Sequence, residues 1–421
     1  LLDPVVEMRT DHFELTVPAS REAFAQRLSA IEGVGRQEAE QFLDKQRRVA
    51  DALWDLFRDP DLLPPFGVRA LLTHLKRVPQ YLPILPIVGR SFAALLKKYG
   101  LDEGPVRDYF DAVCQITVQT GASQAEAPFA LGATDYFFRG AGHIHGGIGN
   151  LAAALADCVE QMGGHVSYAD SVLALEQEGD GWRVRARRGE WEVDQVVANV
   201  LPAALEELTG PSVELSGLAG LEDEVQSGWG AAMLYLGLDA DADLPAEPTH
   251  LQLVGDGDRP CAEGNHVFCS IAGADETERA PEDQRTVTCS THVDMDELLG
   301  ADESEQAAYV ERVQETMRET LRRRAPEIAE AVVKEMTASP RTFERFTGRP
   351  NGYVGGVPRR AGFHNYRRLT PVQPAPGLYL VGDSVFPGQS TLACAIGGVK
   401  VAGEVARRLQ TPRVKDGSHH A

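Results

Sequence analysis

The stretch PGLYLVGDSVFPGQSTLACAIGGVKVAGEVARRL, residues 376–409, predicts a short buried strand that leads through a loop into a helix. The strand is the apolar run Leu378–Val381. We predict the helix because apolar residues recur at steps of three and four from Leu392 to Leu409. Ser390 or Thr391 can cap it, since either hydroxyl can accept a hydrogen bond from an unpaired amide of the first turn.

A ligand site is one interpretation of this strand–loop–helix unit. In α/β folds, a helix N-terminus that follows a buried strand offers free amides and the positive end of a dipole to an anionic or electron-rich ligand. Asp383 comes directly after the strand and can accept hydrogen bonds from ligand hydroxyls. The alternative is a strand–turn–helix of an ordinary α/β protein that binds no ligand there.

The run Val-Gly-Asp-Ser-x-Phe-Pro-Gly-Gln, residues 381–389, resembles the C-terminal flavin-binding signature of phytoene desaturases and carotenoid (prolycopene) isomerases. The resemblance implies FAD as cofactor, with Asp383 on its ribityl chain and the next helix pointing at the flavin ring. The residues implied to line the approach to the cofactor are Gly382, Gly388, Gln389, Ser390 and Thr391.

The resemblance also implies the architecture: an α/β, FAD/NAD(P)-binding Rossmann-like domain of the glutathione-reductase type, incomplete at its N-terminus, beside an α+β substrate domain with a mixed sheet. Strand-like runs separated by acidic loops between residues 203 and 338 independently predict a mixed, mostly antiparallel sheet. We expect the following division: 141–202 and 370–409 for FAD, 5–140 and 203–369 for substrate, and 410–421 as a disordered tail.

The chain opens Leu1-Leu2-Asp3-Pro4, without the strand, glycine-rich turn and helix that would hold the FAD diphosphate. Gly147-x-Gly149-x-x-Ala152 formally fits the dinucleotide fingerprint, but no apolar strand precedes it, so we reject it as the diphosphate loop. We therefore expect the N-terminal part of the FAD domain to be missing from this sequence.

Two glycine clusters resemble family segments on the substrate side of the flavin. The first comprises Gly146, Gly147 and Gly149, and the second comprises Gly355 and Gly356, where a flat ligand could approach the backbone. A plain cluster of turns is the alternative for the second. The resemblance further places the backbone near Val172 against the adenine.

His143 and His145 are two residues apart, but no third metal ligand is in sight, so we interpret them as structural or as part of the active-site wall. The six cysteines are scattered without metal-finger spacing, which favours thiols in a reducing, cytoplasmic compartment.

Pattern predicts further elements along the chain. Alternation over 5–17 predicts a strand or hairpin, and helical periodicity predicts helices after Ser20 and over 37–56, two over 107–132, and others over 151–161 and 303–323. The remaining predicted strands are 165–169, 172–177, 182–187, 191–199, 231–238, 250–254, 266–271 and 286–293.

Charge is uneven along the chain. The 421 residues carry a net charge of −21, which argues against a general nucleic-acid binder. From Leu62 to Leu101, however, there is no acidic residue among many apolar and basic ones. One interpretation is a surface that makes peripheral contact with an anionic membrane and admits a lipophilic substrate. The other is a pair of core helices broken at Pro79 and Pro83.

The resemblance implies an FAD-dependent oxidoreductase that desaturates or isomerises a polyene or isoprenoid by hydride chemistry at flavin N5. No strong side-chain base stands out, and no catalytic residue is named. The alternatives are an amine-oxidase-like or retinol-saturase-like flavoprotein acting on another substrate, or a truncated chain unable to hold FAD.

Overall fold

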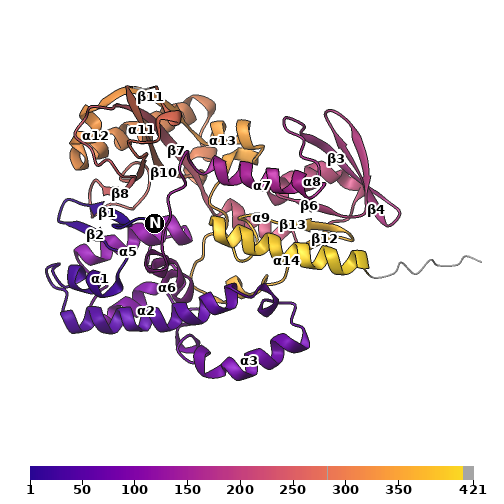
Figure 1. Ribbon diagram of the computed structural model, residues 1–421, viewed down its shortest axis with the longest axis horizontal. Coiled ribbons are helices and arrows are strands. Elements are labelled where there is room, and N and C mark those ends of the chain that lie inside the picture. The colour runs from indigo at the N-terminus through magenta and orange to yellow at the C-terminus, as the bar shows by residue number, and fades with distance from the viewer. Residues whose placement is uncertain (282, 411–421) are drawn as a thin grey trace, which may run out of the picture.

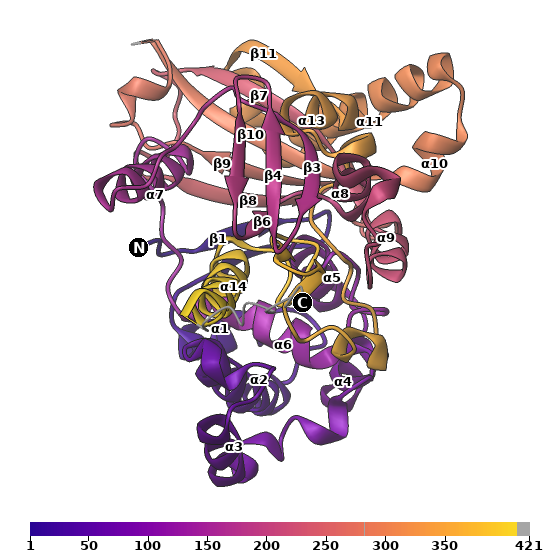
Figure 2. The same cartoon turned by 90° about the vertical axis from the view of Figure 1, so that its right-hand side faces the viewer.

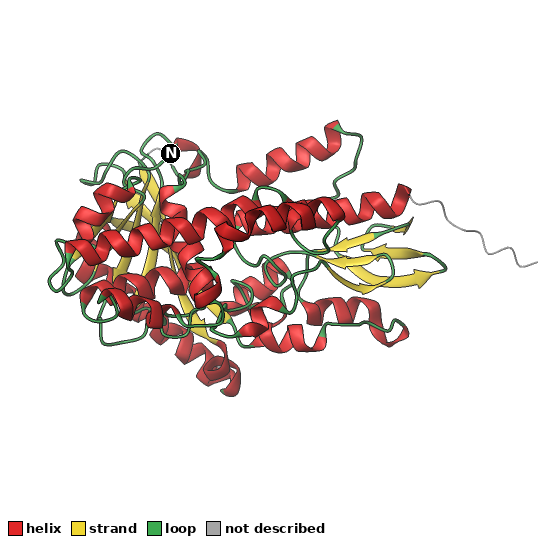
Figure 3. Ribbon diagram, turned by 90° about the horizontal axis from the view of Figure 1, so that it is seen from below, coloured by secondary structure: helices red, strands yellow, loops and turns green. Residues whose placement is uncertain are grey.

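The computed structural model describes residues 1–281 and 283–410; the tail expected to be disordered lies outside them beyond residue 410. The strands are β1 (Val6–Arg9), β2 (Glu14–Val17), β3 (Val172–Glu178), β4 (Gly181–Ala186), β5 (Glu190–Val193), β6 (Val196–Ala198), β7 (Trp229–Asp239), β8 (Thr249–Val254), β9 (His266–Ile271), β10 (Gln284–Asp294), β11 (Val332–Ala338), β12 (Val372–Ala375) and β13 (Leu378–Leu380). The seven-stranded sheet and the β3–β4–β5 hairpin sheet lie at opposite ends of the molecule (Figure 3).

The helices connect and cover these sheets (Figure 1). They are α1 (Arg21–Leu28), α2 (Arg36–Phe57), α3 (Val68–Tyr81), α4 (Phe92–Leu96), α5 (Pro105–Val118), α6 (Ala127–Asp135), α7 (Gly149–Gln161), α8 (Pro202–Thr209), α9 (Ala219–Gln226), α10 (Met295–Gly300), α11 (Glu303–Arg324), α12 (Pro326–Glu330), α13 (Pro340–Thr347) and α14 (Thr391–Gln410).

The largest sheet has the strand order β11-β7-β10-β9-β8-β1-β2. Its pairs are antiparallel except for β1 and β8, which confirms the predicted mixed, mostly antiparallel sheet. The eleven residues of β10 alternate strictly between buried and half-buried, as expected when one face of a strand packs on a core. The predicted hairpin at the start of the chain is also confirmed, as β1 and β2.

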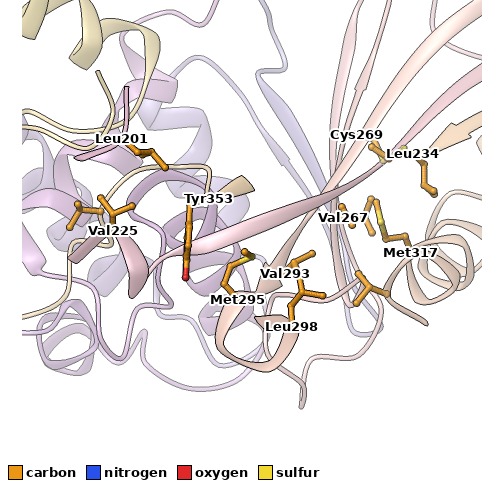
Figure 4. Packing of buried hydrophobic residues seen from close by; sticks show 14 of the residues in the cluster. Leu201, Val225, Leu234, Val267, Cys269, Val293, Met295, Leu298, Met317 and Tyr353 are labelled. Atoms are coloured by element: carbon orange, nitrogen blue, oxygen red, sulfur yellow. The ribbon is translucent and has the colours of Figure 1, made fainter. Parts of the chain in front are cut away.

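Two hydrophobic cores support the fold. One lies within the helices α1, α2, α4, α5 and α6 together with β1 and β2. The other extends from the large sheet and α11 to the small sheet β12-β13-β6, so Met317 and Leu380 belong to the same core. Figure 4 follows part of this second core from Met317 and Leu234 to Val225 and Leu201. The small sheet is therefore packed against the elements around the large one.

The small sheet assembles segments far apart in sequence. β13 pairs parallel with β6 in the register Leu378↔Val196 and antiparallel with β12. All three residues of β13 are buried, as predicted for the strand ahead of the Gly-Asp turn. The predicted 191–199 strand is wrong as one element: β5 and β6 belong to different sheets because the chain turns between them at Asp194-Gln195.

Two further expectations fail. Residues 165–169 form no strand, although Val166 and Tyr168 alternate with polar neighbours. Residues 62–101 also do not form the pair of core helices broken at Pro79 and Pro83 that was one of the two interpretations of this stretch. α3 continues through Pro79, and Ala70 is its only buried residue. Across the described residues, no helix has the length and apolar character needed to cross a bilayer.

Candidate functional site

The loop between β13 and α14 is built from residues with unusual backbone geometry. Gly382 and Gly388 have φ values of 112° and 116°, a region that side chains strongly disfavour. Ser390 is the helix cap: its Oγ accepts from the amide of Ala393 at 3.2 Å, which confirms one of the two predicted caps. Ser390 and Thr391 are both exposed. The amides of Ala393 and Cys394 are thus bonded to Ser390, and the residues that open α14 lie at the surface.

Asp383 lies in this loop and is held by Arg349. The guanidinium donates to both carboxylate oxygens at 3.0–3.2 Å, and the two side chains are 22% and 20% exposed. Arg349 also donates from Nε to the carbonyl of Tyr353 at 2.5 Å. The Asp383 carboxylate is thus fixed in direction yet still open to solvent. The sequence interpretation overlooked Arg349, for which the only signal was its position in the Arg-Pro-Asn-Gly turn.

The second glycine cluster lies directly against Asp383. Gly355 and Gly356 have φ values of 80° and 70°. A Cβ on Gly356 would overlap the backbone carbonyl of Asp383, and one on Gly355 would overlap the side chain of Gln119. The structure therefore brings Gly356 against the Asp383 loop, while the place of both glycines on the substrate side of a flavin stays a prediction. Only glycine permits this approach of two backbones.

Gln389 anchors the loop to α5. Its Nε2 donates to the carbonyls of Ile116 and Thr117 at 3.1 and 2.6 Å, while its Oε1 is buried without a hydrogen-bond partner among the described residues. Gln389 was expected to line the cofactor approach, but its amide nitrogen is engaged by the protein itself.

A cation lies beside Gly388. Arg359 donates from Nη2 to the carbonyl of Pro387 at 3.2 Å, and its guanidinium lies over the ring of Phe129 at 5.4 Å. Burial lowers the pKa of Arg359 to about 10, so it stays charged at neutral pH. A Cβ at Gly388 would come within 2.6 Å of this guanidinium. A positive charge therefore borders the loop at Pro387 and Gly388.

A buried glutamate, Glu126, is bonded through its backbone to Arg359. Glu126 is fully buried and accepts from the hydroxyl of Tyr366 at 2.6 Å and the amide of Gly89 at 2.8 Å. Burial raises the pKa of Glu126 despite these hydrogen bonds, and burial likewise raises the pKa of Tyr366. The backbone amide of Glu126 donates to the carbonyl of Arg359 at 2.8 Å, so Glu126 helps to position the segment that carries Arg359. The sequence alone gave no reason to single out Glu126.

The first glycine cluster lies elsewhere. The amide of Gly146 donates to Glu276 at 2.8 Å, and a Cβ on Gly147 would contact Arg279. Gly149 is the first residue of α7. These glycines therefore lie against the turn around residues 273–279, and their role beside a substrate stays a prediction.

The two histidines near this cluster each contact a carboxylate. His143 bonds to the buried Glu276 at 2.8 Å, and His145 lies 3.2 Å from Glu278. Within the described ranges, no three potential ligands gather to hold a metal ion. Val172, expected near the adenine, begins β3 and is 41% exposed; the carbonyl of the preceding Ser171 accepts from the amide of Arg187.

No protein-family model matches the chain. The chain is, however, similar to curated proteins. It is 25% identical over 328 residues to the prolycopene isomerase of Arabidopsis thaliana, and the match covers 75% of this chain and 54% of that protein. It is also 26% identical over 250 residues to the 4,4'-diapophytoene desaturase of a Methylomonas species, covering 58% and 47%. The chain thus spans about half the length of the curated relatives it matches.

Solved structures establish the fold. A putrescine oxidase variant superposes with a TM-score of 0.55 at 13% identity, over 95% of this chain and 81% of that one. The cyclohexylamine oxidase of Brevibacterium oxydans gives 0.53 at 10% identity, over 96% and 80%. An oxidoreductase from Methanosarcina mazei gives 0.54 at 19% identity, over 83% and 75%. The chain is therefore similar in sequence to a prolycopene isomerase and to a diapophytoene desaturase, and it shares the fold of these amine oxidases.

Proposed function

We propose that this protein is an FAD-dependent oxidoreductase that acts on a polyene or isoprenoid, by desaturation or by cis–trans isomerisation. The observation that carries the proposal is the convergence of Asp383, the backbone of Gly356 and the exposed start of α14 in one loop, in a chain related to a prolycopene isomerase and a diapophytoene desaturase. In this proposal, segments 141–202 and 370–409 hold the cofactor, and 5–140 and 203–369 hold the substrate.

The residues present fit the half of FAD that consists of the ribityl chain and the flavin ring. Asp383 offers oriented carboxylate oxygens to hydroxyl groups, and the first amides of α14 can face the electron-rich edge of a ring. Gly382 and Gly388 supply the bare backbone that a flat ring needs for close approach. The diphosphate half fits less well, because among the described residues no strand is followed by a Gly-x-Gly-x-x-Gly turn and a helix.

The residues of the site would bind and orient. Arg349 would keep the Asp383 carboxylate pointed at the ligand, and Arg359 would place a positive charge beside the loop. The flavin, when bound, supplies the hydride chemistry. A hydrocarbon substrate offers no polar groups, so it would be held by buried apolar area, at about 25 cal/mol per Å². The protein would then need alignment and exclusion of water more than a strong base.

The test begins with cofactor content. Purified protein is reconstituted with FAD, and retained flavin is measured by absorbance after gel filtration. We expect Asp383→Asn to lower retention at least tenfold, and Asp180→Asn, in the exposed turn between β3 and β4, to leave it unchanged. Loaded protein is then incubated with phytoene or poly-cis lycopene in liposomes, and the pigments are separated. Equal retention by both variants, or unchanged pigments with fully loaded protein, would contradict the proposal.

Peripheral membrane contact by a cytoplasmic protein belongs to the same proposal, and α3 supports it. Val68, Leu72 and Leu75 on this helix are 76%, 56% and 70% exposed, and Leu82 and Leu85 continue the apolar surface beyond it. The helix carries Arg69, Lys76 and Arg77 and no acidic residue. An amphipathic, basic helix of this kind lies at the interface of anionic membranes.

Vesicle sedimentation tests the contact. We expect binding to vesicles that contain phosphatidylglycerol, weaker binding at 0.5 M salt, and loss of binding in Leu75→Glu. Phe346→Glu is the matched control, because Phe346 is a 76% exposed apolar residue on α13. Equal loss in both variants, or no binding by the unaltered protein, would contradict a contact through α3.

A further inference from the structure

The large sheet has one face in a core and one face that is only partly covered. Leu234, Cys289 and Leu253 belong to the core that includes α11. On β10 the residues that point away from this core are all half-buried and all polar. They are Gln284, Thr286, Thr288, Ser290, His292 and Asp294. We call this side of the sheet the polar face.

The polar face begins at the candidate site. His292 bonds through Nε2 to Oε1 of Gln119 at 3.1 Å. A Cβ on Gly355 would overlap the Gln119 side chain, and the glycine that follows lies against the Asp383 loop. Because a strand rises about 3.4 Å per residue, Thr288 lies about 14 Å along the face from His292.

A row of hydrogen-bonding side chains crosses the polar face at this distance. Directly opposite one another on four adjacent strands are Tyr235, Thr288, Ser270 and His250. Figure 2 shows the strands that carry them side by side, in the order β7, β10, β9 and β8. Tyr235 is 36% exposed and the other three are half-buried, so a ligand can reach the row.

The row is neutral, and its hydroxyl groups can bind a ligand. Among the residues that the structure describes, no partner bonds to the side-chain oxygen of Tyr235, Thr288 or Ser270. Burial lowers the pKa of His250, and the nearby His143 lowers it further, so the imidazole is uncharged at pH 7. Hydroxyl groups and a neutral imidazole both donate and accept hydrogen bonds. The row therefore suits a neutral group that can do both.

Buried polar atoms without partners lie on the same face. Oγ1 of Thr286 and Oε1 of Gln252 are buried and have no hydrogen-bond partner in the described part of the chain. The register places Gln252 opposite Phe268, and Phe268 opposite Ser290, so Gln252 belongs to the polar face. A sheet face that was simply solvated would not bury such atoms, because leaving them unpaired is costly. They indicate that a polar molecule completes this face when it is bound.

We propose that the substrate of this protein is an isoprenoid that carries a terminal hydroxyl group, and that Thr288 and Ser270 bind this hydroxyl. Because it takes the Asp383 loop as the place of the reaction, this substrate assignment rests on the proposed function. The apolar chain would extend from that loop along Met233 and Phe268, which lie on the polar face between His292 and the row. Apolar contact would hold the chain, and the row would fix how far the substrate enters.

Charge and hydrogen bonding separate this substrate from two others. A pure hydrocarbon would leave the hydroxyl groups of the row and the buried oxygen of Gln252 without partners, which disfavours its binding. A charged amine would need a carboxylate, and the row has none; the half-buried carboxylate of β10, Asp294, lies beyond His292 at the end of the strand. A neutral hydroxyl matches the row without a counter-charge.

Binding of a matched ligand pair tests the assignment. Rhodopin is lycopene hydrated at one terminal double bond, so it adds a single hydroxyl group to the same chain. Each polyene is titrated in detergent micelles into the purified protein, with and without FAD, and the quenching of tryptophan fluorescence gives the dissociation constant. We expect rhodopin to bind about tenfold more tightly than lycopene, because its hydroxyl bonds to the row.

Variants of the row separate recognition of the hydroxyl from packing. Thr288→Val combined with Ser270→Ala removes two hydroxyl groups with little change in volume, so the affinity for rhodopin should fall about tenfold and that for lycopene should stay the same. Thr337→Val is the matched control and should change neither affinity. Thr337 is an exposed threonine of β11 opposite Leu234, so it lies on the other face of the sheet. If circular dichroism shows that the double variant does not fold, the affinity ratio in the unaltered protein decides.

Four results would overturn the assignment. They are equal affinities for the two polyenes, no binding of either, equal weakening of both by the double variant, and tighter binding of geranylgeranylamine than of geranylgeraniol. Protein that retains FAD and converts lycopene without preferring rhodopin would refute the hydroxyl-bearing substrate and leave the flavin function intact. A preference for rhodopin in protein that cannot retain FAD would refute the flavin function and leave the binding row intact.

Discussion

Replacing Glu276 by glutamine should release the segment that leads into α7. The Glu276 side chain is fully buried and accepts hydrogen bonds from His143 at 2.8 Å and from the amides of Gly146 and Gly273 at 2.8 and 3.0 Å. Burial alone would raise the pKa of this carboxyl, but the hydrogen bonds outweigh it and lower the pKa to about 2. The carboxylate therefore fastens the segment that leads into α7 to the turn after β9.

The magnitude follows from this pKa. A fall from the ordinary 4.5 to about 2 corresponds to about 3 kcal/mol of folding free energy, at about 1.4 kcal/mol per pH unit. Because the pKa is depressed in the folded protein, this stabilisation is complete above pH 4.5 and is lost as the pH falls towards 2. In Glu276→Gln, the new amide group would face backbone donors, so we expect a loss of about 2–4 kcal/mol at pH 7.

Urea unfolding monitored by circular dichroism at pH 7, 5, 4 and 3 measures the effect. The gap between the unaltered protein and Glu276→Gln should be constant from pH 7 to 5 and should narrow at pH 4 and 3. Glu278→Gln is the matched control: Glu278 is half-exposed, two residues away and next to His145, and its loss should cost less than about 0.5 kcal/mol. A gap that does not change with pH, or equal losses in both variants, would refute the reasoning.

Two variants of the site and one of His292, a buried histidine bonded to Gln119 at 3.1 Å, are tested by the same measurement. Gly356→Ala should lower the free energy of unfolding by about 2–4 kcal/mol, because φ is 70° and the added Cβ meets the Asp383 carbonyl. The control Gly142→Ala, where the Cβ enters open space, should lower it by less than about 1 kcal/mol. Equal losses in the two variants would contradict the close backbone approach. Arg349→Met should cost about 1–2 kcal/mol by removing the charge-assisted bonds to Asp383, and no loss would show that the pair contributes nothing. Burial lowers the pKa of His292 to about 4, so the free energy of unfolding should fall as the pH drops from 6.5 to 4. His292→Gln should reduce the slope of unfolding free energy against pH by the equivalent of up to one proton. An unchanged slope would exclude His292 as the source of this pH dependence.

Local elements were predictable because their signals lie within a few residues of each other. The period of apolar residues gave α14, the alternation in β10 gave a half-buried strand, and the hydroxyl at Ser390 gave a helix cap. The positive-φ glycines at 355 and 356 were likewise visible as a cluster. Each of these depends on backbone sterics or on one face of one element.

Partners across the fold were not predictable. Arg349 reaches Asp383 over 34 residues, and Glu126 reaches Tyr366 over 240. Residues 165–169 had the right pattern and still formed no strand, since a strand exists only where a neighbour supplies its hydrogen bonds. Likewise, the sequence left open whether the apolar residues around α3 lie in a core or on a surface, and the structure exposes most of those on α3, with only Ala70 of that helix buried.

The sequence by itself determined the strand–loop–helix of residues 376–409, the mixed character of the large sheet and the resemblance to carotenoid-modifying flavoproteins, because these follow from local periodicity and from a contiguous motif. Only the tertiary structure decided that Arg349 orients Asp383, that Glu276 ties the start of α7 to the large sheet, and that β6 keeps an open edge. The physical reason is that ion pairs, buried hydrogen bonds and strand pairing depend on distances in space, which chain spacing does not specify.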